Sequence, residues 1–167
     1  AALSTRSRAP FYVAERKSVP LEEITARLAD RVYTFDGNIG GLMPFILQSV
    51  HNNFTTRLNQ MVFARAEGGA LAIEMVEGEY KHRFTLKEGT FTHATFTQRG
   101  DVFEMRSAVQ TELSETGELS LNIVAHFIET PFTRLIRVTL TGEDTLKVVF
   151  DELPSINDAS EMLMELT

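Results

Sequence analysis

From residue 31 onward, apolar residues alternate with polar ones along most of the chain. A period of two is the pattern of β-strands that bury one face and expose the other. Turn-forming clusters separate the alternating stretches, for example Glu77-Gly78-Glu79, Lys87-Glu88-Gly89 and Arg99-Gly100-Asp101. The pattern predicts about eight or nine consecutive antiparallel strands joined by short loops.

The alternation is clearest in the second half of the chain, where the buried face of each strand can be assigned. Two successive strands each place their apolar residues on one face. These residues are Phe103, Met105, Val109 and Leu113 in one strand and Leu119, Leu121, Ile123, Ala125 and Phe127 in the next. We therefore expect them to contribute to one shared core.

A short helix is predicted on either side of the strands. Pro20, with Glu22 and Glu23 just after it, favours the start of the first helix. The apolar stripe of this helix consists of Leu21, Ile24, Leu28 and Val32. The second helix is expected to begin at Asn157 or Asp158 and to carry Met162, Leu163 and Leu166.

A meander of this length favours an up-and-down barrel, because closure of the sheet removes exposed strand edges. We therefore predict a mainly β domain over residues 18–167, with the antiparallel strands closing into a barrel. A sandwich of two sheets is the alternative. Residues 1–17 are polar and basic, and they are predicted to form a linker or an irregular lead.

Composition removes several classes of function. The net charge of −7, with acids and bases interleaved, offers no basic patch for nucleic acid. The absence of cysteine excludes disulfides, thiolate metal sites and cysteine nucleophiles. No stretch approaches the roughly 20 apolar residues that a membrane-spanning helix requires, so no membrane span is predicted.

Two of the four histidines are expected at the surface. His51 lies in a His-Asn-Asn turn, and His126 lies on the polar face of its strand. His82 and His93 instead share a strand face with apolar neighbours, among them Phe84 and Phe91. These two histidines and two phenylalanines are the candidate ligand-binding residues of the chain.

The geometry of this candidate site depends on one hairpin. If Leu86 to Phe91 forms a hairpin with a two-residue loop, Phe84 falls opposite Phe91 and His82 falls opposite His93. With a three-residue turn the two histidines are offset by one position. A metal site needs a third ligand, and the spacing specifies none, so we predict neither a metal nor a cofactor.

The sequence lacks the motifs of several enzyme classes. It contains no G-x-S-x-G nucleophile elbow and no S-x-x-K arrangement. It also contains no G-x-G-x-x-G segment and no P-loop, so phosphate binding is not indicated. No catalytic residue is therefore assigned. The many phenylalanines are expected to fill the interior, and a ligand cavity within a barrel is the alternative.

Several segments nevertheless resemble a known family when they are read in order. They are the helix from Pro20-Leu21-Glu22-Glu23 to Leu28-Ala29, the stretch from Asp30 to Asn38 that includes Tyr33 and Phe35, Gly40-Gly41-Leu42, Thr130-Pro131-Phe132, and the stretch from Val138 to Leu146. This set resembles the C-terminal, lipocalin-like β extension of bacterial serine hydrolases related to β-lactamases and penicillin-binding proteins. The resemblance covers about residues 18–153.

The resemblance implies that the chain is an accessory domain whose partner is the serine-hydrolase catalytic domain of the same polypeptide. The family's S-x-x-K, Y-x-N and K-T-G elements have no counterpart here, since none of Tyr12, Tyr33 and Tyr80 is followed by asparagine two positions on. No catalytic residue can therefore be transferred.

Three functions are left open. The first is a non-catalytic interaction domain of such a hydrolase. The second is a stand-alone barrel that binds a small apolar or amphipathic ligand. The third is an enzyme that uses His82 and His93 for acid-base or metal chemistry.

Overall fold

The computed structural model describes residues 16–36, 40–55 and 57–155. Its helices are α2 (Leu21–Leu28), α3 (Phe45–Val50) and the 3₁₀ turn η1 (Glu67–Gly69). Its strands are β1 (Lys17–Val19), β2 (Arg31–Thr34), β3 (Gln60–Arg65), β4 (Leu71–Glu77), β5 (Tyr80–Leu86), β6 (Thr92–Gln98), β7 (Asp101–Leu113), β8 (Leu119–Phe127), β9 (Thr133–Leu140) and β10 (Leu146–Leu153).

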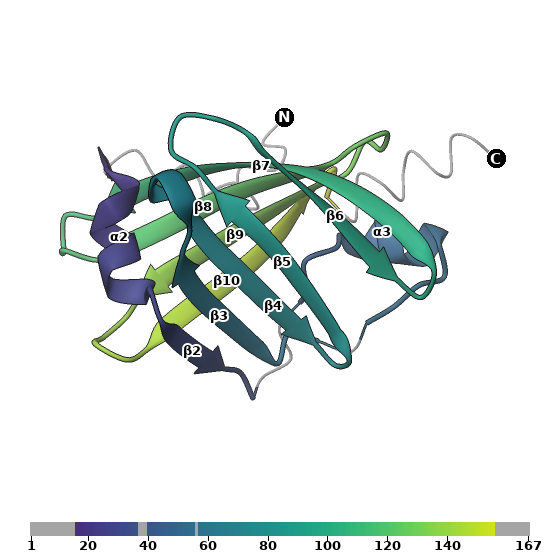
Figure 1. Cartoon of the computed structure of the whole chain (residues 1–167), viewed down its shortest axis with the longest axis horizontal. Coiled ribbons are helices and arrows are strands. Elements are labelled where there is room, and N and C mark those ends of the chain that lie inside the picture. Colours follow the sequence, from purple (N-terminus) through teal and green to yellow (C-terminus); the bar gives the residue numbers. More distant parts are fainter. Residues whose placement is uncertain (1–15, 37–39, 56, 156–167) are drawn as a thin grey trace, which may run out of the picture.

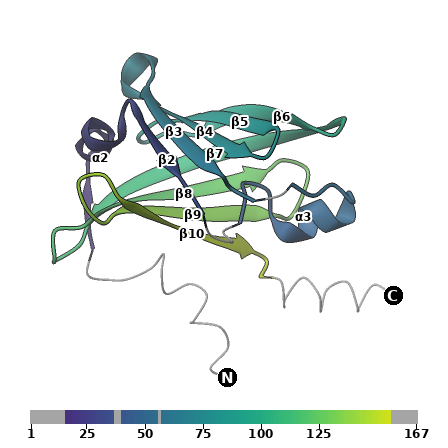
Figure 2. The same cartoon turned by 90° about the horizontal axis from the view of Figure 1, so that it is seen from below.

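The strands form two antiparallel sheets that face each other (Figures 1 and 2). The four-stranded sheet has the order β2-β3-β4-β5. The six-stranded sheet has the order β1-β7-β8-β9-β10, with β6 also pairing with β7. All pairings are antiparallel, so the predicted mainly β, antiparallel architecture is confirmed.

The core lies between the two sheets and contains the residues that alternation assigns to it. Phe127, Leu121 and Ile123 of β8 are almost completely buried, as is Met105 of β7. Phe63 of β3 contributes from the opposite sheet and is also inaccessible. Burying side chains of this size is the main favourable term in folding, at roughly 1.5–3 kcal/mol for each one.

The first predicted helix is present as α2, but it is shorter than the apolar stripe suggested. Leu21, Ile24 and Leu28 are buried, and the helix stops before Asp30, which has a φ of 63°. Val32 belongs to β2, where its side chain is 55% exposed. The alternating pattern of β2 therefore replaces the last turn of the predicted helix.

The prediction of a closed barrel is wrong for the described residues. The ladder between β5 and β6 ends at one isolated bridge, between Lys87 and Thr90, so these consecutive strands belong to different sheets. The alternative of two sheets describes the arrangement better. Short loops predict that consecutive strands are neighbours, but they do not require that neighbours stay hydrogen-bonded along their length.

Other differences concern the helices and the ends of the domain. The sequence pattern did not predict α3, because the helix has only six residues and its apolar side chains lie on both faces. Ile46 and Leu47 are buried, whereas Phe45 and Val50 are exposed. The predicted C-terminal helix and most of the predicted lead over residues 1–17 lie outside the described residues. Lys17, at the end of that lead, pairs with Leu113 of β7. No helix in the described part of the chain has the length and apolar character needed to cross a membrane.

Candidate functional site

We call the line where β5 and β6 face each other without a continuous ladder the seam. The two strands are joined by a two-residue turn, Glu88-Gly89, in which Gly89 has a φ of 74° that glycine tolerates without strain. The Thr92 hydroxyl donates a hydrogen bond to the Thr85 carbonyl oxygen, at a position where a backbone N–H would continue a ladder. Beyond this contact, β5 pairs only with β4, and β6 only with β7, among the described strands.

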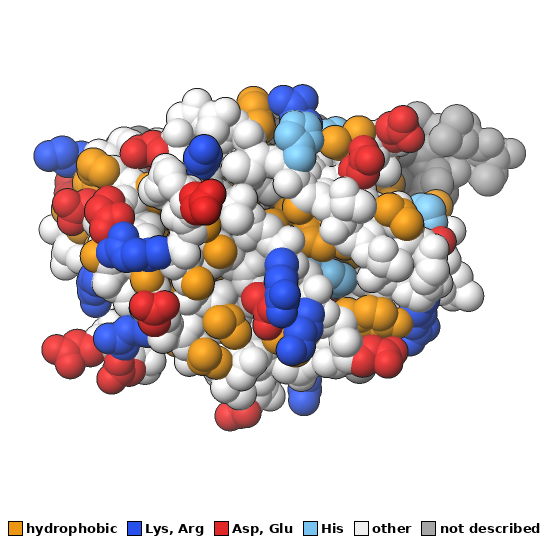
Figure 3. Space-filling view, in the orientation of Figure 1, with side chains coloured by type: hydrophobic (Ala, Val, Ile, Leu, Met, Phe, Trp, Pro, Cys, Tyr) orange, Lys and Arg blue, Asp and Glu red, His pale blue; other side chains and the backbone are white. Residues whose placement is uncertain are grey.

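A groove of about 410 Å³ follows the seam on the outer surface. Its walls are three consecutive residues of each strand, Arg83–Thr85 and His93–Thr95. Ile73 and Phe84, which belong to the core, reach its floor. Val62, Ala64, Ala72 and Glu74 line the side formed by the four-stranded sheet. Small side chains on the outward face thus leave apolar surface accessible, and Figure 3 shows hydrophobic side chains between charged ones on this face.

A second hollow adjoins this groove and shares Thr85 and His93 with it. It is also lined by Lys87 and Phe91. The Phe91 ring is 57% exposed, and the guanidinium carbon of Arg106 lies 4.5 Å from its centroid. An aromatic face capped by a cation in this way is a favourable contact of about 0.5–1 kcal/mol at an exposed site.

The strands of the seam carry positive charge although the whole chain is acidic. Neither β5 nor β6 contains aspartate or glutamate. Basic side chains on or beside these strands are those of Lys81, Arg83, Lys87, His93 and Arg99. Arg83 is paired with Glu74 of β4, and the other carboxylate of the hairpin, Glu88, accepts a hydrogen bond from the backbone N–H of Leu21. Glu74 itself lines the groove, so its ion pair with Arg83 balances the charge of the one arginine in the groove wall.

The structure does not bring the four predicted ligand-binding residues together. His82 and Phe84 point inward and are 2% and 4% exposed, whereas Phe91 and His93 lie at the outer surface. The bridge between Lys87 and Thr90 also places the turn one residue later than the two-residue loop considered above. Of the two registers left open, the one in which His82 faces His93 is therefore not found, although Phe84 and His93 both line the groove. His51 and His126 are exposed, as predicted.

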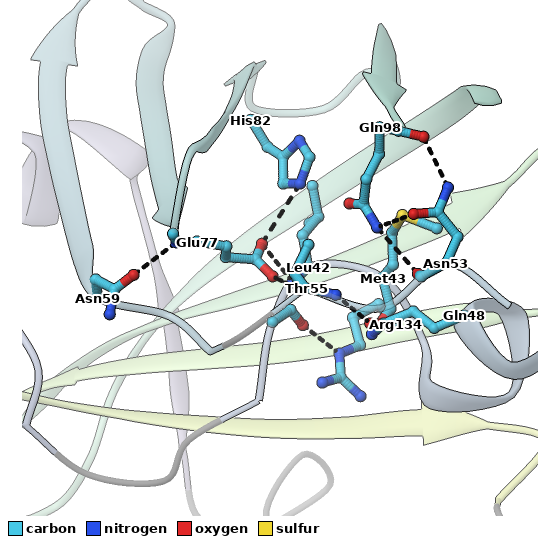
Figure 4. Close-up of polar contacts among 12 residues, drawn as sticks. Leu42, Met43, Gln48, Asn53, Thr55, Asn59, Glu77, His82, Gln98 and Arg134 are labelled. Carbon is cyan, nitrogen blue, oxygen red and sulfur yellow. Dashed lines mark hydrogen bonds and ion pairs between the residues drawn. The ribbon is translucent and has the colours of Figure 1, made fainter. Parts of the chain in front are cut away.

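A buried polar cluster lies below the seam, centred on Glu77 at the end of β4 (Figure 4). The Glu77 carboxylate accepts hydrogen bonds from the Leu42 N–H, at 3.1 Å, and from the Thr55 hydroxyl, at 2.8 Å. His82 Nε2 lies 3.7 Å from Glu77 Oε2. This distance is too long for a hydrogen bond, so the two groups interact through charge and packing.

Arg134 links the same cluster to the six-stranded sheet. Its Nε donates a hydrogen bond of 2.9 Å to the Gly41 carbonyl oxygen, and its guanidinium lies 3.5 Å from the Glu152 carboxylate. Glu152 also accepts a 3.4 Å hydrogen bond from the N–H of Phe45, the first residue of α3. Burial lowers the pKa of Arg134 from its ordinary value, and the nearby carboxylates of Glu152 and Glu77 oppose that shift.

Amide side chains attach the loop after α3 to β6. The Asn53 side chain donates to the Gln98 carbonyl oxygen at 2.7 Å, and the Gln98 side chain donates to the Asn53 carbonyl oxygen at 3.1 Å. Gln48 donates to the Met43 carbonyl oxygen at 2.9 Å. These contacts give buried backbone carbonyls hydrogen-bond partners, which is a usual role of buried amides.

The protonation of His82 follows from its surroundings. Burial lowers the pKa of His82, while the negative charge of Glu77 and a hydrogen bond with Gln98 act in the opposite direction. A ring that is 2% exposed and packs edge-on against Phe96, with 5.2 Å between centroids, has no access to a substrate. The cluster therefore connects loops to both sheets, and its side chains are shielded from solvent.

Sequence reasoning missed this cluster, although part of the signal was present. Gln98 and Arg134 continue the inward faces of β6 and β9, where Phe96 and Ile136 are core residues. A polar residue on an apolar face indicates a buried polar contact. Glu77 and Asn53 gave no such signal, because both stand in clusters typical of exposed turns.

The described residues hold no group of three or more histidine, aspartate or glutamate side chains arranged to bind a metal ion. Compared with known proteins, the chain matches no family model, no curated protein and no solved structure.

Proposed function

We propose that this domain is a non-catalytic binding module and that the groove along the seam is its binding surface. The observation that carries the proposal is the opening between β5 and β6, where core residues Ile73 and Phe84 reach the outer surface. Grooves of about 300–1,000 Å³ with apolar linings and a few polar groups are the usual form of binding sites.

The chemistry of the groove suits an occupant with an apolar part and a polar part. Val62, Ala64 and Ala72 offer apolar contact, whereas His93 and the ion pair of Arg83 with Glu74 supply polar groups. The buried groups of the polar cluster, His82 and Glu77, are separated from it by the core residues of its floor. This separation supports binding without chemistry.

Two identities of the occupant are supported by different observations. The segments resembling the accessory domain of β-lactamase-related serine hydrolases favour a protein partner, namely a catalytic domain of the same polypeptide. The groove volume of about 410 Å³ equally suits a small apolar or amphipathic ligand. The protein partner is the first candidate, because an open groove between strand edges suits a polypeptide.

Filling the groove tests the proposal. The probe is 1-anilinonaphthalene-8-sulfonate, an anionic aromatic dye that binds accessible apolar surface, and dodecanoate serves as its competitor. Ala72 is half-buried and points into the groove, so Ala72→Phe fills the space with a ring. We expect dye affinity to fall about tenfold in this variant, since about 1.4 kcal/mol of apolar contact is lost.

Val124→Phe is the matched control. Val124 is 44% exposed on the outer face of β8, so the substitution adds a ring to a sheet surface remote from the seam. Dye affinity should be unchanged in this variant. Equal dye binding by Ala72→Phe and the unsubstituted domain would show that the groove is not the binding surface.

A further inference from the structure

We propose that residues 1–15 form an arm that crosses the outer face of the six-stranded sheet and packs on β8 and β9. This inference goes beyond the proposed function, since it assigns an occupant to a surface that the groove does not include. Three observations carry it: outward side chains that are buried, the place where the arm joins the described part of the chain, and the bulky apolar residues that the arm contains.

The outer face of β9 is buried although no described helix covers it. Alternation points Leu135 and Arg137 away from the core, since Ile136 between them is a core residue. Outward side chains of a two-sheet sandwich normally face water, yet Leu135 is 3% exposed and Arg137 is 5% exposed. Figures 1 and 2 show α2 and α3 at the two ends of the sandwich. Neighbours within one sheet flank such side chains but do not roof them, so a further segment of the chain is needed as cover.

The described part of the chain begins where this buried track begins. β1 pairs with β7 at the edge of the sheet, through Lys17 and Leu113. The Arg16 side chain then reaches over the outer face, where its Nη1 donates a 2.9 Å hydrogen bond to the Ser120 hydroxyl. Ser120 is completely buried and shares the outward face of β8. The arm is therefore attached at one end of the track.

The length of the arm matches the track. Ser120 and Val124, the partner of Leu135, are four positions apart on β8, which corresponds to about 13 Å. The step from β8 to β9 adds about 5 Å sideways. An extended chain covers this distance with about four or five residues, counted back from Arg16. The bulky apolar residues at that distance are Phe11, Tyr12 and Val13.

The other end of the chain is the rival occupant. Residues 156–167 follow β10, whose Leu153 pairs with Thr133, two positions before Leu135. A segment entering from that end would reach Leu135 first and Ser120 last. The Ser120 end of the track is already joined to the arm by Arg16, so the arm is the occupant that the contacts favour.

An indole placed in the arm reports its packing, because the chain has no tryptophan of its own. The probe is acrylamide, which quenches the fluorescence of accessible indoles, applied to the whole chain carrying Tyr12→Trp. We expect quenching about tenfold slower than for N-acetyltryptophanamide, as for an arm that is docked about ten times as often as it is free. Adding Leu135→Asp places a charge beneath the arm and should restore most of the quenching.

Val102→Asp in the same Tyr12→Trp background is the matched control. Val102 is 64% exposed at the other end of β7, so its substitution should leave the quenching unchanged. Far-ultraviolet circular dichroism checks that each variant is folded. The pair Phe11→Ser and Val13→Ser alters the arm alone, and should release the indole without any change to the sheets.

Quenching of the Tyr12→Trp variant as fast as that of N-acetyltryptophanamide would overturn the proposal. So would slow quenching that neither Leu135→Asp nor the two serine substitutions change, since the indole would then be packed elsewhere. Nuclear Overhauser contacts of the Leu135 methyl groups in the unsubstituted chain distinguish the rival. Contacts with the rings of Phe11 or Tyr12 support the arm, whereas contacts with Met162 or Leu163 assign the cover to residues 156–167 and reject it.

Discussion

Gly41 shows how closely single atoms are fitted around the buried carboxylate of Glu77. A Cβ atom at Gly41 would lie 1.9 Å from Glu77 Oε1 and 2.7 Å from its Cδ. The carboxylate cannot move aside without losing its hydrogen bonds to Leu42 and Thr55. Glycine is therefore required at this position by close packing and not by backbone conformation.

We expect Gly41→Ala to lower the free energy of unfolding by about 2 kcal/mol, the cost typical of an overpacked site. Urea denaturation of the wild type, both single variants and the Gly41→Ala/Glu77→Ala double variant would measure it. Because the two residues are in contact, the double variant should lose less than the sum of the single losses. Simple additivity would contradict this account.

His82 makes stability depend on pH in a predictable direction. Its pKa is lowered in the folded state, so the unfolded chain binds the proton more readily. The contribution of the neutral ring is complete above the unfolded pKa of about 6.5 and declines as the pH falls through that value toward the lower folded pKa. The decline has a limiting slope of about 1.4 kcal/mol per pH unit.

His82→Phe should flatten the pH dependence of the unfolding free energy between about pH 6.5 and 5.5, because it removes this titrating group. The ring still packs against Phe96. Thermal or urea unfolding over this pH range makes the measurement. His126→Gln changes an exposed histidine and should leave the slope as it is. An unchanged slope in His82→Phe would show that this part of the pH dependence does not come from His82.

At the scale of elements, the β5–β6 hairpin also supports α2. Pro20 supplies no side-chain cap to this helix, and the Glu88 carboxylate, in the hairpin turn, accepts a 3.2 Å hydrogen bond from the N–H of Leu21. A carboxylate at a helix N-terminus satisfies a free donor and interacts favourably with the helix dipole. The turn thus provides a cap from a distant part of the chain.

Glu88→Ala should therefore destabilise the domain by about 1 kcal/mol, the usual cost of losing a helix cap. The measurement is the midpoint of urea unfolding at fixed protein concentration and pH. Glu115→Ala, in the exposed turn between β7 and β8, removes an acid without such a contact and should have no measurable effect. Equal effects of the two substitutions would contradict the capping role.

The sequence predicted where the strands lie, but not whether they close into a barrel. Alternation identified the inward faces of β7 and β8, because an antiparallel sheet with one buried face imposes that pattern on side chains. It carried no information on whether β5 and β6 remain paired, since an edge strand and a central strand can have the same alternation. The closed barrel was wrong for this reason.

The candidate site was predicted only in part, again for a physical reason. Phe84 and His93, two of the four predicted residues, line the groove. Ala64, Ala72 and Ala94 also line it, but the sequence pattern did not single them out, because their contribution is to be too small to cover the apolar residues beneath them. The register of a hairpin depends on one turn residue. Placing the turn one position later separated His82 from His93.

At the scale of the whole molecule, the two sheets share one core but are connected unevenly. β8 is paired on both sides, with β7 and β9, whereas β5 and β6 are each paired on one side only. Contacts across the opposite side include the ion pair of Arg31 with Asp144 and the hydrogen bond from Arg27 to the Gly142 carbonyl oxygen. The two sheets are therefore joined by the β5–β6 turn and its bridge on one side, and by the side chains of Arg27 and Arg31 on the other.

Hydrogen exchange should report this unevenness. Amides of β8 should exchange only by global unfolding, whereas amides on the seam-facing edges of β5 and β6 should exchange at least about a hundredfold faster through local opening. Exchange followed by NMR at constant pH gives the comparison within one sample. Equal protection of β8 and the seam edges would show that the sheets open only together.

The exposed lysine of β5 has one more consequence, for contacts between copies of the domain. An exposed strand edge invites pairing with the same edge of another molecule, and lysine on the edge opposes it. Arg83 is already paired with Glu74, so Lys81 is the charge of β5 that two copies would bring toward each other. Mutual repulsion thus keeps the edge available in dilute salt, and raising the ionic strength should promote self-association by screening that repulsion.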